Sequence, residues 1–534
     1  MNRDQIMNAI GFLLVLLCFV WATVRIAVRA REEADPDRIV LRFAHWQLEG
    51  GIREAFDELA ARYMEMHPHV RVEQMLIPER VYVNWTITQL VGGTAPDLIG
   101  IHTISEERMA RYFTPLMNLV NQPNPYNEGT ELEGVPWRDT FLDGLSGIPS
   151  YRPGLLDYYG IPVSMFTVRL YFNVDLYERI AGDRPLPTTF DELIELCELV
   201  NAYAAETGET IIPISGSRYN APMIIQRLFS AMTQRMALEM DVMHKLERPH
   251  QHAWLAYLDG SWGYQSPPIL SALSVMRSIG QHMQSGFLSL GRDDAMFYFV
   301  QERALMTATG SWDIGSIHMQ APFQISAFAI PMPAADHPEY GRYLLGPLSE
   351  AGFGAGAPFA LTQQSEHPEQ AIDFLHFVTS QAGNQLFTEV SFWLPSVIGV
   401  ELPEKVQPFA LQTEGFPDGL TLTYGADSQR ILENNLHMLM QVDGSPEEFA
   451  RVIDEQMPAA VLHDFRIHYG HWLRQWRRND SLLGALTVLV HDESDPSHPD
   501  WRRFGELIEI GTEQENQMLW VEHELRNQGR SLQF

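Results

Sequence analysis

The stretch RFAHWQLEGGIREAFDELAARYMEMHPHVRVE, residues 42–73, predicts a strand, a helix and a second strand. Apolar residues recur every three or four positions from Ile52 to Met66, which is the period of one helix face. Apolar residues alternate on both sides of this helix, as they do in strands, and Pro68 ends the helix because proline cannot continue it. A β-α-β unit of this kind leaves a crevice at the carboxyl ends of its strands, and Trp46 stands at that end.

The chain is long enough for more than one domain, and it is strongly acidic. Its 534 residues exceed what one hydrophobic core normally organises, so two or more domains are expected. An apolar share of 45% with 20% charged residues is typical of globular proteins rather than disordered ones. The formal net charge of −31 argues against nucleic-acid binding, which needs concentrated positive charge.

Lysine and cysteine usage excludes two further kinds of chemistry. The lysines are Lys245 and Lys405, and neither follows the glycine of a phosphate-binding loop, so a Walker-type ATP site is excluded. If a transporter is involved, this chain is therefore not its motor. The cysteines are Cys18, within an apolar N-terminal run, and Cys197, so the part after that run cannot form an internal disulfide.

The N-terminal run has the length of a membrane anchor. Gln5 to Val24 carries no charge, and about 20 such residues just reach across a hydrocarbon core. The competing interpretation is a signal peptide cleaved after Ala30, but Arg29 and the distance from the apolar run make that site poor. An uncleaved anchor over residues 5–24 is therefore favoured. Arginines after the segment outnumber those before it, so the positive-inside rule alone would leave the main part in the cytoplasm.

Strand and helix patterns continue to alternate along the chain, which indicates an α/β protein. The main segments lie at 92–101, 163–180, 188–206, 211–216, 304–317, 323–333, 368–390 and 445–465.

Residues 466–534 differ in character from the rest of the chain. They carry four tryptophans, and a polar spacer at 491–500 separates two predicted helices. These tryptophans either pack an extra helical layer or contact a partner: Trp472, Trp476, Trp501 and Trp520.

Five stretches, in the same order, resemble the family 1 extracellular solute-binding proteins. They are the strand-turn-helix at 39–66, GTAPDLIGI at 93–101, the long segment 160–200, MTATGSWDIGSI at 306–317, and the helix pair at 367–387 with LPS at 394–396. The family comprises the sugar-capturing components of bacterial ABC importers, of which maltose-binding protein is a familiar member. The resemblance covers roughly residues 38–465 and no single motif in it is specific; the order of the five is what carries it.

The resemblance implies a two-lobed, type II periplasmic-binding-protein-like α/β fold with ligand bound between the lobes. Strands would cross between the lobes near 163–168, 328–331 and 378–382, and the lobes would close about this hinge. The implied division is a membrane anchor or signal segment at 1–34, an N-lobe at 35–165 and 329–379, a C-lobe at 166–328 and 380–465, and a helical extension at 466–534.

The resemblance also implies partners and a location. The partners are a small-molecule carbohydrate and the permease subunits of an ABC transporter, with no cofactor and no nucleic acid. The arginines after the N-terminal run favour the cytoplasm, but the resemblance implies the periplasmic or extracellular side. The chain would be anchored to the cytoplasmic membrane by residues 5–24, or secreted if that segment is cleaved.

A sugar presents apolar C–H faces and a ring of hydroxyls, so its pocket needs aromatic surfaces and fixed hydrogen-bonding groups. Trp312, in TGSWDIG, matches the sugar-stacking tryptophan of the family, although it could instead be a core residue at a helix start. Trp46 and Glu49 lie on the first strand-to-helix loop and either contact the ligand or cover the interface between lobes.

The other candidate residues are proposed from their positions in the sequence. Asp97 either stabilises its own turn or accepts a ligand hydroxyl. The turn AGFGAGAP, 351–358, lacks the helix that a dinucleotide site requires, so it is read as a turn facing the cleft. The remaining predicted ligand-binding residues are Asp313, Ser215, Tyr219, Trp393, Phe353 and Tyr424.

Two other functions stay open beside solute binding. A carbohydrate hydrolase would need two carboxylates about 5 Å or about 6.5–9.5 Å apart, such as Glu49 with Asp97 or Asp97 with Asp313. A membrane-tethered sensor would pass the bound state to a partner through residues 466–534. No metal-ligand spacing occurs, and an anionic ligand would rely on arginines such as Arg169 or Arg218. The sequence favours a sugar-binding protein and not an enzyme.

Overall fold

The computed structural model describes residues 38–101, 104–147, 149–152, 154–241, 250–351, 354–491, 493–495 and 498–532. The predicted anchor at 5–24 and the candidate Phe353 lie outside these residues. Among the residues that are described, none of the helices combines the length and the apolar character needed to cross a membrane.

The first lobe is built on a six-stranded sheet of order β12-β6-β11-β3-β1-β2. Strands β1, β2 and β3 are parallel, whereas β11 runs antiparallel to β3 and β6, and β12 runs antiparallel to β6. The strands span Ile39–His45 (β1), Val70–Leu76 (β2), Leu98–Gly100 (β3), Ile161–Met165 (β6), Ala355–Leu361 (β11) and Leu394–Pro395 (β12).

The predicted β-α-β unit is confirmed as β1, helix α2 (Ile52–Met66) and β2, paired in register from Ile39 with Val70. The apolar face of α2 is buried against the sheet, with Phe56 and Leu59 almost wholly inaccessible to solvent. Burial of this face supplies most of the stability of such a helix. The chain after β2 enters helix α3 (Glu79–Gly92).

The second lobe is built on a four-stranded sheet of order β10-β7-β9-β8. Its strands span Val168–Asn173 (β7), Ile212–Ser215 (β8), Ala304–Gly310 (β9) and Ile325–Phe328 (β10). Helix α7 (Phe190–Thr207) begins with a capping box, in which the Thr189 side chain accepts from the Glu192 backbone and the Glu192 side chain accepts from the Thr189 backbone.

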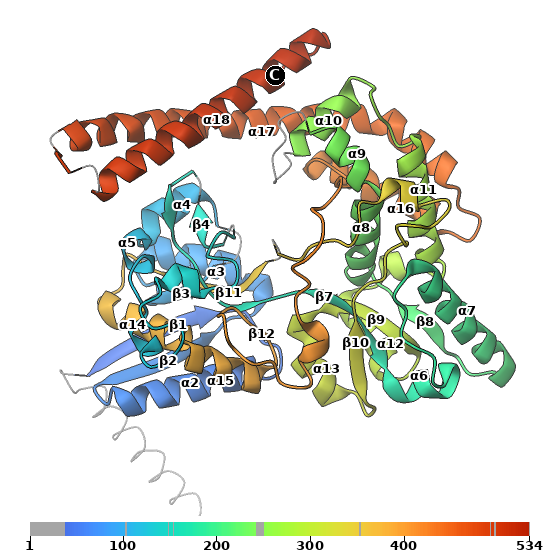
Figure 1. Cartoon of the computed structure of the whole chain (residues 1–534), viewed down its shortest axis with the longest axis horizontal. Coiled ribbons are helices and arrows are strands. Elements are labelled where there is room, and N and C mark those ends of the chain that lie inside the picture. The colour runs from blue at the N-terminus through green and yellow to red at the C-terminus, as the bar shows by residue number, and fades with distance from the viewer. Residues whose placement is uncertain are drawn as a thin grey trace, which may run out of the picture.

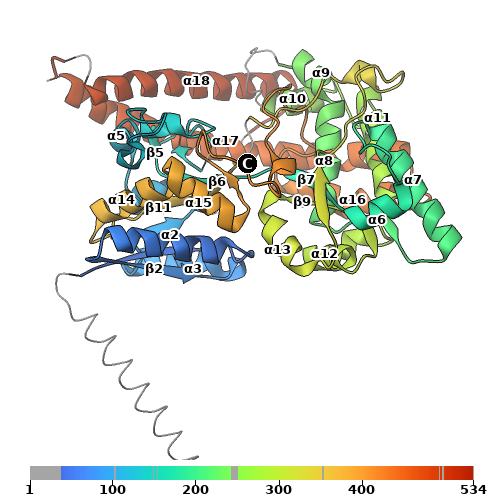
Figure 2. The ribbon, with the colours of Figure 1, turned by 60° about the horizontal axis from the view of Figure 1, so that its bottom comes forward.

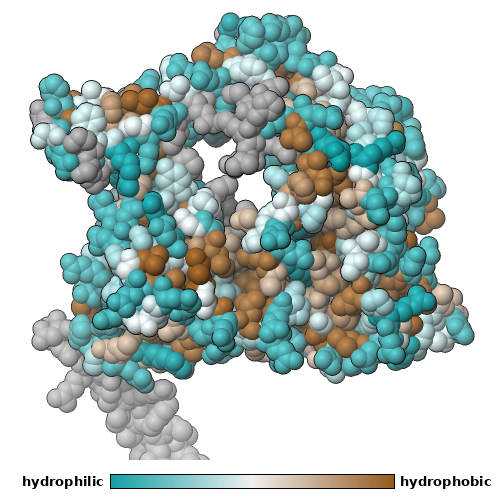
Figure 3. Space-filling model, viewed as in Figure 1, coloured by the Kyte–Doolittle hydropathy of each residue, from teal (hydrophilic) through white to brown (hydrophobic). Residues whose placement is uncertain are grey.

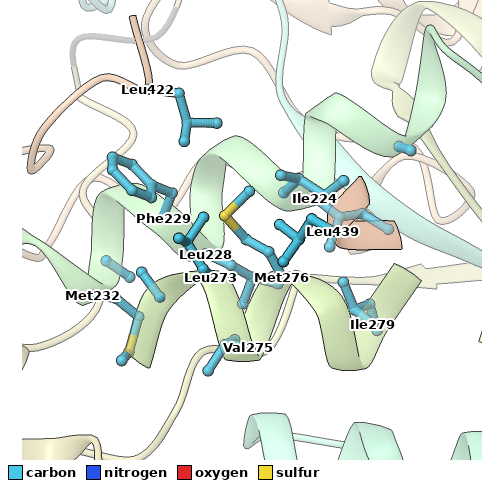
Figure 4. Packing of buried hydrophobic residues seen from close by; sticks show 14 of the residues in the cluster. Ile224, Leu228, Phe229, Met232, Leu273, Val275, Met276, Ile279, Leu422 and Leu439 are labelled. Atoms are coloured by element: carbon cyan, nitrogen blue, oxygen red, sulfur yellow. The ribbon is translucent and has the colours of Figure 1, made fainter. Parts of the chain in front are cut away.

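A large apolar core fills the second lobe, and helices α8 (Asn220–Met232) and α11 (Pro267–Gly280) pack within it. Figure 4 shows Ile224 and Leu228 of α8 facing Leu273 and Met276 of α11. This core is continuous with helix α16 (Ala426–Met440), which contributes Leu439. Residues 426–440 therefore belong to the second lobe.

The chain passes between the sheets at 166–167, between β6 and β7, and again between β10 and β11, within 329–354. The third passage differs from the expected one at 378–382. Helices α14 (Pro368–Val378) and α15 (Gln381–Ser391) stay beside the first sheet, where the Asn384 side chain donates to the Val163 carbonyl oxygen at 2.7 Å. The chain leaves the first lobe only after β12, because α15 packs on α2 and β12 pairs with β6.

The C-terminal part is a hairpin of two long helices, α17 (Pro446–His491) and α18 (Pro499–Asn527). The predicted start of the extension, residue 466, lies in the middle of α17, so no break in the helix separates the extension from the residues before it. Figures 1 and 2 show this hairpin, in orange and red, lying across both lobes. In the space-filling view, openings remain between the hairpin and the body of the molecule (Figure 3).

Candidate ligand-binding cleft

A cleft lies between the lobes and is lined by residues that follow strands of both sheets. Two adjoining cavities of about 360 and 710 Å³ share the lining residues Trp46, Glu49, Glu79 and Arg292, so we treat them as one cleft. These volumes fall in the range of small-molecule sites, about 300–1,000 Å³. Trp46 follows β1, whereas Arg292 begins helix α12 (Arg292–Val300) of the second lobe.

The glycine pair after β1 lets the two lobes approach closely. Ser316 lies in helix α13 (Ile314–Gln320) of the second lobe. The Gly50 backbone N–H, from the first lobe, donates to the Ser316 hydroxyl at 3.0 Å. A Cβ added at Gly315 would lie 2.3 Å from the Gly50 carbonyl oxygen, and Gly51 has a φ of 91°. The glycines therefore place the loop that carries Glu49 directly against the second lobe.

A charged cluster occupies the second-lobe side of the cleft. The Asp313 carboxylate accepts hydrogen bonds from the Arg292 guanidinium and the Thr309 hydroxyl. The Arg292 guanidinium carbon lies 5.3 Å from the centre of the Tyr219 ring. Burial disfavours the charged guanidinium, but Asp313, Tyr219 and Glu49 together outweigh burial and raise the pKa of Arg292. This arrangement fixes Arg292 and Tyr219 relative to the cleft.

Glu49 brings a carboxylate into the cleft from the first lobe. Its Oε2 atom is buried and has no hydrogen-bond partner among the described residues. Burial raises the pKa of Glu49, although its own backbone N–H and the Arg292 charge act in the opposite direction. A buried acceptor without a partner is costly, so this oxygen is suited to accept a hydrogen bond from a ligand.

The net charge of the cleft lining is negative. Among the residues that the structure describes, four carboxylates line it against one guanidinium, that of Arg292. The carboxylates belong to Glu49, Glu79, Asp293 and Asp313. An anionic ligand would therefore meet unfavourable charges on entering.

Aromatic side chains from both lobes form the apolar part of the cleft. The Trp312 ring lies against Gly310, where an added Cβ would come within 2.3 Å of the ring, and its centre is 5.4 Å from that of Phe166. The Trp393 indole N–H donates to the Trp312 carbonyl oxygen at 3.0 Å. Trp46, 5.0 Å from Tyr82 between ring centres, completes the aromatic lining on the first lobe.

Six of the predicted site residues line this cleft: Trp46, Glu49, Tyr219, Trp312, Asp313 and Trp393. Phe353 lies outside the described residues. Arg292 was not anticipated, because an arginine at a helix start has no local pattern that marks it as a cleft residue.

Three other predicted site residues lie elsewhere. Asp97 precedes β3, at the amino end of the strand, and its carboxylate accepts from the Arg42 backbone N–H at 2.8 Å and the Ser365 hydroxyl at 2.6 Å. Ser215 is the buried last residue of β8, beside β9, and donates to the Met306 carbonyl oxygen at 3.4 Å. The Tyr424 ring stacks on Phe465 of α17, with ring centres 4.2 Å apart.

Arg169, which the sequence suggested as a partner for an anionic ligand, pairs with a carboxylate of the protein itself. Its guanidinium is buried and forms an ion pair with Glu350 at 2.7 Å. Within the described ranges, no group of three or more His, Cys, Asp or Glu side chains is placed to hold a metal ion.

The two sheets and the cleft between them define a two-lobed binding protein. A family model described as bacterial extracellular solute-binding protein matches residues 58–412, about two thirds of the sequence. The chain belongs to this family.

Curated relatives include a binding protein of Brucella abortus strain 2308, 24% identical over 370 residues, which span 68% of this chain and 77% of the relative. A Pyrococcus horikoshii protein named as an ABC transporter extracellular-binding protein is 21% identical, spanning 66% of this chain and 71% of the relative. A multiple sugar-binding protein of Streptococcus mutans is 22% identical, spanning 45% of this chain and 52% of the relative.

Solved structures of sugar-binding proteins share the fold. The apo form of RafE from Streptococcus pneumoniae superposes with a TM-score of 0.53 at 18% identity, covering 80% of this chain and 99% of RafE. The GacH receptor of Streptomyces glaucescens, solved unliganded and with acarbose, gives a TM-score of 0.54 at 15% identity, covering 79% of this chain and 98% of GacH.

Proposed function

We propose that this protein captures an uncharged carbohydrate in the cleft between its lobes and delivers it to the permease of an ABC transporter. The observation that carries the proposal is the composition of the cleft. Aromatic rings from both lobes, those of Trp46, Trp312 and Tyr219, line the same cavity as Glu49, whose Oε2 atom lacks a hydrogen-bond partner among the described residues. Aromatic faces match the C–H faces of a sugar, and a carboxylate oxygen matches its hydroxyls.

The charge of the cleft narrows the ligand class. The carboxylates on the lining outnumber the guanidinium of Arg292, and phosphorylated or carboxylated sugars would have to overcome this excess. RafE has been solved with raffinose and GacH with acarbose, and these relatives support a carbohydrate as the ligand. Closure of the lobes around the sugar would desolvate it, and the closed form must bind it more tightly than the open form for closure to follow binding.

Delivery to a permease places the protein on the periplasmic or extracellular side of the cytoplasmic membrane. The family description, extracellular solute-binding protein, and the relative named as an ABC transporter binding protein support this location. We keep the anchor at residues 5–24 and the lobe boundaries at 165 and 328 as part of the proposal.

Hydrolysis is the weaker candidate. Both carboxylate pairs considered from the sequence include Asp97, whose oxygens are engaged by the Arg42 backbone and by Ser365 outside the cleft lining. The family and its structural relatives are binding proteins, which supports a binding role.

A thermal-shift screen tests the proposal. The purified protein is heated with neutral oligosaccharides, amino sugars, uronic-acid oligosaccharides and sugar phosphates, and the bound sugar is recovered for mass analysis. A ligand at a hundredfold excess over Kd stabilises the native state by about 2.7 kcal/mol. We expect a shift with a neutral saccharide that is recovered intact. A cleaved sugar would indicate a hydrolase, and shifts with sugar phosphates alone would contradict the proposed ligand class.

A further inference from the structure

The α17–α18 hairpin is rooted in the second lobe. The first half of α17 contributes Phe449, Ile453 and Phe465 to the apolar core of that lobe, and the end of α18 contributes Val521 and Leu525. The root is thus part of a large, continuous hydrophobic core. Its detachment would expose this apolar surface, so the root cannot separate from the second lobe without local unfolding.

Polar contacts also fix the root. The Arg530 guanidinium donates to the Leu258 carbonyl oxygen at 2.9 Å, and the Tyr469 hydroxyl donates to Glu522 at 3.0 Å. The first of these joins the chain after α18 to helix α10 (His250–Leu258), and the second joins α17 to α18. The two helices therefore leave the second lobe as one body.

The tip of the hairpin rests on the first lobe. In α17, the Arg478 guanidinium contacts the Glu106 carboxylate at 2.6 Å and donates to the Gly154 carbonyl oxygen at 3.2 Å. Glu106 begins helix α4 (Glu106–Tyr112) of the first lobe. In α18, Arg503 forms an ion pair with Asp157, a buried residue of strand β5 (Asp157–Tyr158).

The apolar part of the tip contact is small. Leu486 of α17 and Leu507 of α18 form a separate cluster with Leu156 of the first lobe, with Leu483 and Phe504 packed against it. This cluster is isolated from the cores of both lobes. In the part of the chain that the structure describes, the tip is therefore held by polar pairs and one small cluster, whereas the root is held by a core.

A second linkage joins the lobes on the other side. The three passages of chain between the lobes meet at the Arg169–Glu350 ion pair, because Glu350 also accepts from the Thr167 hydroxyl at 2.7 Å and from the Gln412 backbone N–H at 2.9 Å. The lobes are thus joined by covalent passages at one place and by the non-covalent tip at another, besides the direct contacts at the cleft such as that of the Gly50 N–H with the Ser316 hydroxyl. Rotation about the passages changes the distance that the tip spans.

The hairpin lies beyond the part of the chain that the family model matches, which ends at 412. It is visible in Figure 1 as a bar over both lobes. Openings remain beneath it in Figure 3, so it bridges the lobes through its tip and not by filling the space between them.

We propose that the hairpin tip is a latch that holds the two lobes at one separation and must release or shift before they can rotate about the passages. Its role in regulating ligand capture rests on the proposed function, but the latch itself is a property of the unliganded protein. Each contact made only in the latched arrangement shifts the equilibrium between lobe arrangements by its own free energy.

Distances between the lobes in the unliganded full chain test the latch. Spin labels are placed at Ala61→Cys on α2 and Glu198→Cys on α7, both exposed, in a background with Cys18→Ser and the buried Cys197 retained. Pulsed electron paramagnetic resonance then gives the distance distribution. No ligand is required, so failure of the proposed function would not obscure the result.

The test variants are Arg478→Ala, which removes an ion pair at the tip, and Leu486→Ala, which reduces its apolar cluster. The matched control is Arg477→Ala, the exposed neighbouring arginine. We expect both test variants to broaden the distribution or move it to a new distance, and the control to match the wild type. Unchanged distributions in both test variants, with helical content retained, would overturn the latch, as would an equal change in the control.

Discussion

The Arg169 guanidinium and the Glu350 carboxylate form a bidentate ion pair in which Nη1 and Oε1 are 2.7 Å apart and Nη2 and Oε2 are 2.9 Å apart. Both side chains are nearly inaccessible, at 2% and 0% exposure. Arg169 is the second residue of β7 in the second sheet, whereas Glu350 lies on the passage back to the first sheet. The pair therefore stands where the chain passes between the two lobes.

Removing the Glu350 charge should destabilise the protein strongly. Glu350→Gln leaves the buried Arg169 guanidinium without a countercharge, and breaking a buried pair in this way costs about 3–5 kcal/mol. The free energy of unfolding, measured in urea, should fall by that amount. The exposed pair Arg62–Glu58 is the control, and Glu58→Gln should cost less than about 0.5 kcal/mol. Equal effects in the two variants would contradict the assigned role.

The same variant should lose a pH-dependent part of its stability. Burial alone would raise the pKa of Glu350, but the hydrogen bond and charge of Arg169, with the hydrogen bonds from Gln412 and Thr167, together outweigh burial and lower the pKa below the ordinary 4.5. The stabilisation from this carboxylate is therefore present above pH 4.5 and is lost as the pH falls through the lowered pKa. The difference in unfolding free energy between wild type and Glu350→Gln should narrow on acidification below that value.

Glu49→Gln should stabilise the unliganded protein and weaken ligand binding. Burial raises the pKa of Glu49, so the ionised side chain is less favourable in the folded state above its ordinary pKa. A neutral amide removes this cost, which predicts a gain of about 1 kcal/mol near pH 7 that disappears as the pH falls and Glu49 becomes protonated. Thermal unfolding at several pH values, with and without the sugar found in the screen, measures both effects. A less stable variant at pH 7 would contradict this account.

Trp312→Ala should remove most of the ligand-induced thermal shift. The ring is part of the cleft lining, and losing a well-packed aromatic contact in a binding site costs about 2 kcal/mol, or roughly 30-fold in Kd. Trp312→Phe keeps an aromatic face and should stay within about fivefold of the wild type. Isothermal titration with the identified sugar compares them. Equal losses in both variants would indicate that the indole supports the fold and does not stack on the ligand.

The sequence predicted those parts of the fold that depend on local pattern. The unit from β1 to β2 is marked by a change of apolar period at Ile52 and by Pro68, and both signals lie within the stretch 42–73. Trp46 and Glu49 were placed at the cleft because they follow the carboxyl end of β1. The position of Trp312 came from a resemblance and not from periodicity.

Long-range packing decided the features that the sequence did not reveal. The third passage lies later than expected because α15 packs on α2, more than 300 residues away in the chain. Asp97 precedes its strand, and this order alone places it at the end opposite the cleft. Tyr424 packs on Phe465 of α17, a contact that no local pattern predicts. Arg292 is held at the cleft by its ion pair with Asp313 and its contact with the Tyr219 ring, and both partners are distant from it in the sequence.

Asp97→Ala should reduce stability without changing ligand affinity. The substitution leaves the Arg42 backbone N–H and the Ser365 hydroxyl without their acceptor, and an unmet buried hydrogen bond costs about 1–3 kcal/mol. Urea unfolding should show this loss, and titration with the identified sugar should give the wild-type Kd. A Kd raised tenfold would return Asp97 to the ligand site.

The close approach of Gly50 and Gly315 predicts a loss from a substitution that normally stabilises helices. Gly315 lies in α13 without a positive φ, where alanine is intrinsically favoured over glycine by about 1 kcal/mol. Its Cβ would, however, lie 2.3 Å from the Gly50 carbonyl oxygen and 3.3 Å from the Ser391 carbonyl oxygen. Both are backbone atoms that no rotamer change can move.

Gly315→Ala must therefore displace the loop that carries Glu49, and we expect a stability loss of about 1–3 kcal/mol together with weaker sugar binding. The control is Gly484→Ala in α17, where no heavy atom lies within 4 Å of an added Cβ, so that stability should rise by about 0.5–1 kcal/mol. Urea unfolding and titration of both variants separate helix propensity from steric conflict. If Gly315→Ala gained stability as Gly484→Ala does and bound sugar normally, the loop would not need its contact with α13 to form the cleft.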